Sequence, residues 1–385
     1  MKSYLFIFRI ILIIFLTTSC SEDDPIEDKV LFTYTSEDPS KAQLILLDTD
    51  GNLIDNQKVS NQLAELNGPS NIDRFTVVNV DTTTIGRRPT IQIFVNVNQS
   101  EWKKSSIAIP NKGNLIDVKI ASELQNERLV ISGEHRRIYT AGSLDNSVNA
   151  SIEDKIVLIW NEIDKTPKFA SYSDLSQDFM ELNVSAADFS EMSYQDISSI
   201  PSDAYLYWHL GRTNTSQQNR YDLMDVKSID VTDGYYYPAG LFDFWYTGFG
   251  FNDNNPNEAY YTDYYGERPS TVTKLDIGTI THEITLPMYN VNSSNQSVDV
   301  IVSLLKSYNA EMTIYSKNGE TVPFENLFNT LKDLYPELEL STYVQYHTWF
   351  YEIDGWEYDD FIKDKLSSDG LSNDIKSWKY YYKKN

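Results

Sequence analysis

The feature that most limits the fold is a long succession of short runs rich in β-branched and aromatic residues. Each run is bounded by residues that favour turns. In the clearest run, Ile91, Ile93, Val95 and Val97 occupy every second position and would share one side of a strand. An Asp-Gly pair at 50–51 stands between two apolar runs, which is typical of a hairpin. These patterns predict a mainly β protein.

The length of the chain predicts more than one packed unit. It has 385 residues, of which 41% are hydrophobic, so it exceeds one ordinary core and has enough apolar material for several. We expect two or more β-sandwich-like modules of the immunoglobulin type. Residues 30–122 would form the first, and residues 123–320 a second β-rich domain or a pair of domains. A small α+β segment would follow at 321–385.

Apolar spacing changes near the C-terminus. From Phe324 to Tyr335 the apolar residues recur at three and four positions, which predicts a helix that ends before Pro336. Residues 343–351 resemble a strand. A second helix is expected around 361–366. The spacing of Ile375, Trp378 and Tyr382, followed by two lysines, predicts a third helix.

The first nineteen residues have the order of an export signal. Lys2 and Arg9 flank a short segment that leads into the apolar run 10–16, and small polar residues follow at 17–19. The apolar run is shorter than the roughly 20 residues that a spanning helix needs. We therefore expect residues 1–19 to be a signal peptide that is removed.

Thr18, Ser19 and Cys20 resemble the cleavage motif of the lipoprotein signal-peptide class. That resemblance implies fatty acyl chains attached to Cys20, cleavage just before it, and membrane attachment through the lipid. The acidic run at 21–24 resembles the surface-export signal of Bacteroidota-type lipoproteins. Residues 20–29 would then form an acidic tether. The resemblance implies a protein on the outer membrane that faces the cell exterior.

Charge and cysteine content restrict the partners. The formal net charge is −24, which disfavours binding to the phosphate backbone of nucleic acids. Cys20 is the single cysteine, so the chain can form neither an internal disulfide nor a thiolate metal cluster. Its stability must come from packed cores, and we expect no nucleic-acid partner.

No catalytic signature stands out in the sequence. His282-Glu283 lacks the second histidine of a zinc protease motif, and no nucleophile elbow or phosphate-binding loop is present. We therefore do not expect an enzyme, and no cofactor is implied. A weak calcium candidate is the loop with Asp253, Asn255 and Asn257, whose side-chain oxygens suit a hard cation. An ordinary Asn- and Pro-rich turn is the favoured interpretation of that loop.

Aromatic density is the most unusual feature. Tyrosine and tryptophan can stack on a ligand while their polar ends stay hydrated. Two clusters, at 235–265 and 343–358, carry most of these residues. The alternative is packing within strands and cores. The candidate ligand-binding residues are Trp245, Tyr246, Tyr260, Tyr264, Trp349 and Trp356.

Three functional hypotheses follow from the sequence. The first is a cell-surface protein that binds a glycan or a protein ligand. The second is a structural or accessory subunit of an outer-membrane complex, with an envelope protein as its partner. The third, which the sequence favours least, is a polysaccharide hydrolase, because paired carboxylates suffice for that chemistry and acidic residues abound. Fold and location alone do not decide between them.

Overall fold

The computed structural model confirms a mainly β protein. The α-helices among the described residues are α2 (Phe324–Leu334) and α3 (Tyr358–Leu366), and two short 3-10 helices, η1 (Ser122–Leu124) and η2 (Ala186–Asp188), join strands. The described residues are 28–36, 42–81, 88–104, 114–125, 127–133, 136–141, 145–150, 155–160, 166–173, 181–212, 220–223, 229–230, 233–252, 255–285, 287–307, 310–336, 344–366 and 376–384.

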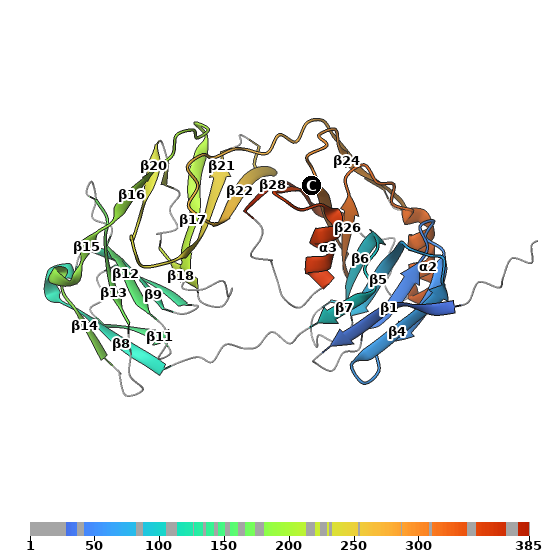
Figure 1. Cartoon of the computed structure of the whole chain (residues 1–385), viewed down its shortest axis with the longest axis horizontal. Coiled ribbons are helices and arrows are strands. Elements are labelled where there is room, and N and C mark those ends of the chain that lie inside the picture. The colour runs from blue at the N-terminus through green and yellow to red at the C-terminus, as the bar shows by residue number, and fades with distance from the viewer. Residues whose placement is uncertain are drawn as a thin grey trace, which may run out of the picture.

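A sheet of 13 strands is the frame of the molecule. In Figure 1 it runs from β17 and β21, beside the green group of strands on the left, to β5 and β6 among the blue strands on the right. β19 (Ile229–Asp230) pairs with β17 at one end. The other strands follow in spatial order: β18 (Arg220–Asp222), β17 (Ala204–Arg212), β21 (Phe244–Phe251), β22 (Glu258–Gly266), β28 (Ser377–Lys384), β27 (Val344–Ile353), β25 (Val300–Lys306), β26 (Glu311–Lys317), β6 (Thr90–Val97), β5 (Phe75–Asp81), β2 (Gln43–Leu47) and β3 (Leu53–Lys58).

One parallel pairing joins distant parts of the chain inside this sheet. β6 pairs with β26 in parallel, and Ile93 lies opposite Ile314. Residues from both sides of the expected boundaries at 122 and 320 therefore share one sheet and the cores on its two faces. The domain boundaries stay predictions, but the chain on either side of them is not packed separately.

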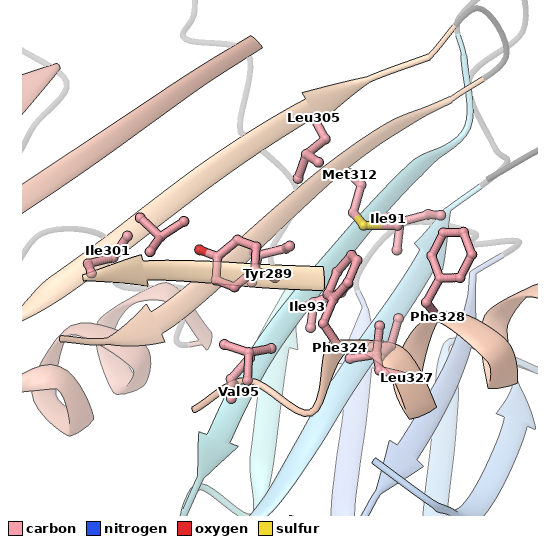
Figure 2. Packing of buried hydrophobic residues seen from close by; sticks show 14 of the residues in the cluster. Ile91, Ile93, Val95, Tyr289, Ile301, Leu305, Met312, Phe324, Leu327 and Phe328 are labelled. Atoms are coloured by element: carbon pink, nitrogen blue, oxygen red, sulfur yellow. The ribbon is translucent and has the colours of Figure 1, made fainter. Parts of the chain in front are cut away.

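The first face of the long sheet is covered by α2 and by the hairpin of β23 (Ile280–Thr285) and β24 (Met288–Ser293). Ile91, Ile93 and Val95 point from β6 into this core, as their alternation predicts. Figure 2 shows them near Tyr289 from the hairpin and Leu327 from α2. The core continues along the sheet as far as Phe350, Tyr381 and Tyr260.

Among the described residues, a small sheet covers the second face toward the β3 end, and α3 packs against it as far as Trp378 of β28. The hydroxyl of Tyr358 at the start of α3 donates to the backbone oxygens of Val95 at 2.6 Å and Tyr315 at 2.9 Å. These bonds hold the start of the helix against the sheet. The small sheet has the order β4 (Leu63–Pro69), β1 (Asp28–Ser36) and β7 (Glu101–Lys104).

A separate β-sandwich occupies the middle of the chain. Its two sheets enclose a core that includes Val118, Leu158 and Leu182. Its outer surface meets Phe242 and Trp245 at the end of the long sheet. Nearby in sequence, β16 (Ser193–Asp196) pairs antiparallel with β20 (Gly234–Tyr237). The sheets of the sandwich are β10 (Arg136–Ala141), β9 (Arg128–Gly133), β12 (Ile156–Trp160), β13 (Lys168–Tyr172), β15 (Ser190–Glu191), and β11 (Asp145–Ala150), β8 (Asn114–Ile120), β14 (Glu181–Val184).

The C-terminal segment confirms two expected helices and corrects the third. The spacing from Phe324 onward does form α2, and α3 includes residues 361–366. The helix expected at 375–382 is wrong, because Ser377–Lys384 is strand β28, paired on both sides with β22 and β27. Cross-strand pairing of its aromatic side chains outweighs the helical spacing of three residues.

Candidate ligand-binding face

Aromatic side chains continue along the second face of the long sheet beyond the part that α3 covers. Their positions follow from strand register, since residues that lie opposite one another share a face. Tyr261, for example, lies opposite Gly250 on one side and Tyr380 on the other. We call this region the aromatic face, and its aromatic residues are Tyr205, Tyr207, Trp208, Tyr246, Tyr261, Tyr265, Trp349, Tyr380 and Tyr382.

A β-bulge in β17 places two aromatic residues in succession on this face. The register between β17 and β21 shifts between Leu206 and Trp208, so Tyr207 is the extra residue of the bulge. In a regular strand, consecutive side chains would point to opposite faces. Here the rings of Tyr207 and Trp208 lie 6.1 Å apart, and Trp208 is 40% exposed. The bulge thereby creates a local concentration of aromatic surface.

Two glycines in β21 allow tyrosine rings to lie close over the sheet. A Cβ at Gly248 would come within 2.8 Å of Cε1 of Tyr207, and one at Gly250 within 2.4 Å of Cζ of Tyr205. Such distances exclude any larger residue unless the rings move. The glycines therefore let these two rings approach the backbone of the neighbouring strand.

Asp263 anchors the rings from the middle of the face. It is 6% exposed, and its carboxylate accepts hydrogen bonds from Tyr207 at 2.7 Å and from Tyr246 at 2.9 Å. The Tyr207 and Tyr380 hydroxyls are 3.3 Å apart, which adds a third tyrosine. Burial raises the pKa of Asp263 to about 6, and the two tyrosine bonds oppose that rise. The result is a hydrogen-bonded set of rings held in fixed positions.

The ring contacts extend across several strands. The centroid of Tyr261 lies 5.0 Å from that of Tyr207 and 5.0 Å from that of Tyr380, with which it stacks. On the next row, Tyr382 and Trp349 have centroids 5.6 Å apart. His347 contacts both of these rings from the same strand as Trp349. The contacts form two groups on the same face, one across β17, β22 and β28 and the other across β28 and β27.

The six aromatic residues that the sequence singled out do not share one surface in the structure. Trp245 is 4% exposed, packs parallel to the ring of His209 at 5.2 Å, and belongs to a core. Its proposed role in ligand binding is therefore incompatible with its burial. Tyr246 and Trp349 do lie on the aromatic face.

The remaining three candidates lie elsewhere. Tyr260 and Tyr264 point to the first face, where the Tyr264 hydroxyl accepts a bond from the backbone N–H of Thr273 at 3.2 Å. Trp356 packs, partly buried, against the core around α3. Seven aromatic-face residues, at 205, 207, 208, 261, 265, 380 and 382, were not among the six candidates. The glycines at 248 and 250 are the one local signal of close ring approach.

The weak calcium candidate is only partly described. Asp253 lies outside the described residues. Asn255 Oδ1 accepts a bond from the backbone N–H of Asn257 at 3.0 Å, and the Asn255 carbonyl accepts one from Glu258 at 3.0 Å. These contacts are those of an Asx turn. Within the described ranges, no group of three or more potential metal-ligating side chains is present.

The described histidines have low pKa values for a physical reason. Burial lowers the pKa of His209 to about 3, and Arg268 adds to that effect. Burial also lowers the pKa of His282 to about 4, and its Nε2 lies 3.1 Å from Oγ1 of Thr348. Both rings are thus neutral near pH 7 and serve packing and hydrogen bonding.

Comparison with known proteins gives no family for this chain. No protein-family model matches it, and no curated protein matches it either. Within the described part of the chain, none of the helices has both the length and the apolar character needed to cross a membrane. The chemistry of the aromatic face therefore has to support a functional proposal by itself.

Proposed function

We propose that this protein is a surface lipoprotein that binds a glycan through its aromatic face. Sugar rings have apolar faces edged by hydroxyl groups. Tyrosine and tryptophan offer a matching surface, because their rings are apolar and their ends are polar. The exposed ring of Trp208 beside Tyr207 and Asp263 is the observation that supports this proposal best.

Fixed rings favour binding because less conformational freedom is lost when the ligand arrives. Tyr207 and Tyr246 are both bonded to Asp263, so their rings are already ordered without a ligand. A tyrosine ring also presents a large contact area with few rotatable bonds. The aromatic face thus combines two properties of a ligand-binding surface, rigidity and amphipathic character.

Binding to neutral polysaccharides tests the proposal. Starch, mannan, xylan and β-glucan would each be cast into native gels, and retardation of the protein would be compared with that of the Trp208→Ala variant. A matched control is Tyr236→Ala on β20, which removes a ring that is also 38% exposed but lies outside the aromatic face. We expect at least one polysaccharide to retard the wild type and the control, and to release Trp208→Ala. Equal retardation of all three proteins would contradict this site.

The location of the protein has an independent test. Residues 20–27, which include Cys20 and most of the expected tether, lie outside the described residues, while Asp28 and Lys29 belong to β1. The proposal of lipid attachment therefore rests on the sequence resemblance. Mass spectrometry of the native protein should find acyl chains on Cys20 and no trace of residues 1–19. A Cys20→Ser variant should lose membrane association. Recovery of an unmodified Cys20 with the first nineteen residues attached would refute the lipoprotein proposal.

A further inference from the structure

We infer that the aromatic face takes an extended, uncharged glycan chain that lies across the strands, from Trp208 on β17 to Trp349 on β27. This inference rests on the proposed function and specifies the ligand of the same site. Trp208 and Trp349 lie on strands four steps apart in the order β17, β21, β22, β28 and β27. Four steps of about 4.8 Å amount to roughly 19 Å across the strands. Trp208 shares its row with Ile353 of β27, so Trp349 is also displaced by four residues, about 13 Å, along the strands. The two rings are therefore roughly 23 Å apart, which is longer than a single sugar.

The direction of the chain follows from the order of the rings. Tyr207, Tyr261 and Tyr380 come from three different strands, and each neighbouring pair of these rings has centroids 5.0 Å apart. Tyr382 lies two residues beyond Tyr380 on β28 and therefore points to the same face. Its ring contacts Trp349, which completes the path.

The helix α3 limits the path on one side. Phe361 of α3 packs against Trp378 at 6.0 Å and against Tyr351 at 6.3 Å, so both of these rings are covered from the second face. A ligand that ran along β28 from Tyr380 toward Trp378 would meet α3. A ligand that crosses from β22 to β28 and then turns the other way, from Tyr380 to Tyr382, moves away from α3 and reaches Trp349.

Charge specifies the chemical class of the chain. The protein carries a net charge of −24, and Asp263 lies at the centre of the aromatic face. A polyanionic glycan would meet repulsion from both, whereas the hydroxyl groups of a neutral sugar carry no charge to be repelled. We therefore expect neutral sugars to bind and uronic-acid or sulfated chains to bind poorly.

A chain that spans two separated ends has a characteristic dependence on length. Binding at the second end becomes intramolecular once the ligand is long enough to reach it. Affinity should rise with each added sugar and level off when the chain covers about 23 Å. Removal of the tryptophan at either end of the site should then weaken the binding of long chains. A short chain can bind at one end alone.

The experiment is calorimetric titration of the whole mature protein with neutral oligosaccharides of one to eight units. Gluco-, xylo- and manno-oligosaccharides would be used, each against wild type, Trp208→Ala, Trp349→Ala and the control Tyr236→Ala. For the longest bound chains, we expect each tryptophan variant to weaken binding by about tenfold or more. Because Trp349 is partly buried against a core, His347→Ala is a second variant at that end.

The outcomes separate the two proposals. A steep rise in affinity with length, with losses at both ends, supports the inference. If a single sugar binds as tightly as the longest chain, or if only the Trp208 end matters, the spanning chain is wrong and glycan binding stands. If none of these sugars and none of the polysaccharides binds, both proposals fail. Tight binding of polyuronic acid in the same titration would overturn the uncharged class alone.

Discussion

Tyr207 on β17 donates a 2.7 Å hydrogen bond to Asp263 on β22, across the strand that lies between them. Gly248 on β21 makes this bond possible, because a Cβ there would lie 2.7 Å from Oδ1 of Asp263. The β-bulge at Tyr207, the glycine and the carboxylate thus form one arrangement. It fixes aromatic rings on the second face of the sheet.

Gly248→Ala should destabilise the protein by about 1–3 kcal/mol, because the new methyl group overlaps both Asp263 and the Tyr207 ring. Chemical denaturation monitored by circular dichroism measures this loss. In a Tyr207→Ala background one of the two overlaps is gone, so the same substitution should cost less. An equal cost in both backgrounds would show that the ring does not lie where we describe it.

Asp263 should make stability fall as pH rises from about 4 to about 6. Its pKa in the folded protein is raised to about 6 by burial, while the unfolded chain binds this proton only below about pH 4. The folded state therefore holds more protons within that window, and the free energy of unfolding decreases with pH there and is constant above it. The full change is about 3 kcal/mol.

The Asp263→Asn variant isolates this contribution, since other buried acids such as Asp299 also have raised pKa values. Urea titrations at a series of pH values would give the difference in unfolding free energy between the two proteins. We expect that difference to shift by up to about 3 kcal/mol between pH 4 and pH 7 in favour of the variant. A difference that does not change with pH would mean that Asp263 keeps an ordinary pKa.

Truncation of Trp245 should lower the stability of the protein far more than truncation of Trp208. Trp245→Ala removes a core residue that is 4% exposed and should cost about 3–5 kcal/mol of stability. Trp208→Ala removes a ring that is 40% exposed and should change stability by no more than about 1 kcal/mol. Thermal unfolding compares the two directly. A stable Trp245→Ala protein would restore that residue as a surface candidate.

Tyr358→Phe should cost about 1–3 kcal/mol, because it leaves the carbonyl oxygens of Val95 and Tyr315 without the hydroxyl that they share. The phenylalanine ring still fills the same buried space, so packing is preserved. Hydrogen exchange should also accelerate in α3, which this hydroxyl fixes to the sheet. Unchanged exchange in α3 would indicate that its apolar contacts suffice to hold it.

Local patterns in the sequence were sufficient to predict several structural elements. Alternation at 91–97 identified the face of β6 that enters the first core, and apolar spacing from Phe324 identified α2. The Asp-Gly turn was also identifiable: Asp48 accepts bonds from the backbone N–H groups of Asp50 and Asn52, and Gly51 has a φ of 83°. Each of these depends on interactions between residues that are close in sequence.

Features that depend on pairing between distant segments could not be predicted from the sequence. β6 pairs with β26 more than two hundred residues away, which no local pattern indicates. A module at 30–122 was expected, but Val118, near the end of that range, packs with Leu158 in the core of the separate sandwich. The same limit applies to the aromatic face. Trp245 and Tyr246 are adjacent in sequence, and only the register with neighbouring strands shows that the first is buried in a core.

The most direct test of glycan binding is a crystal structure of the mature protein with the longest oligosaccharide that binds it. Our account predicts sugar rings stacked over Trp208 and Tyr261, with the chain continuing across the strands toward Trp349. An oligosaccharide bound on another surface, with the rings around Asp263 untouched, would contradict it.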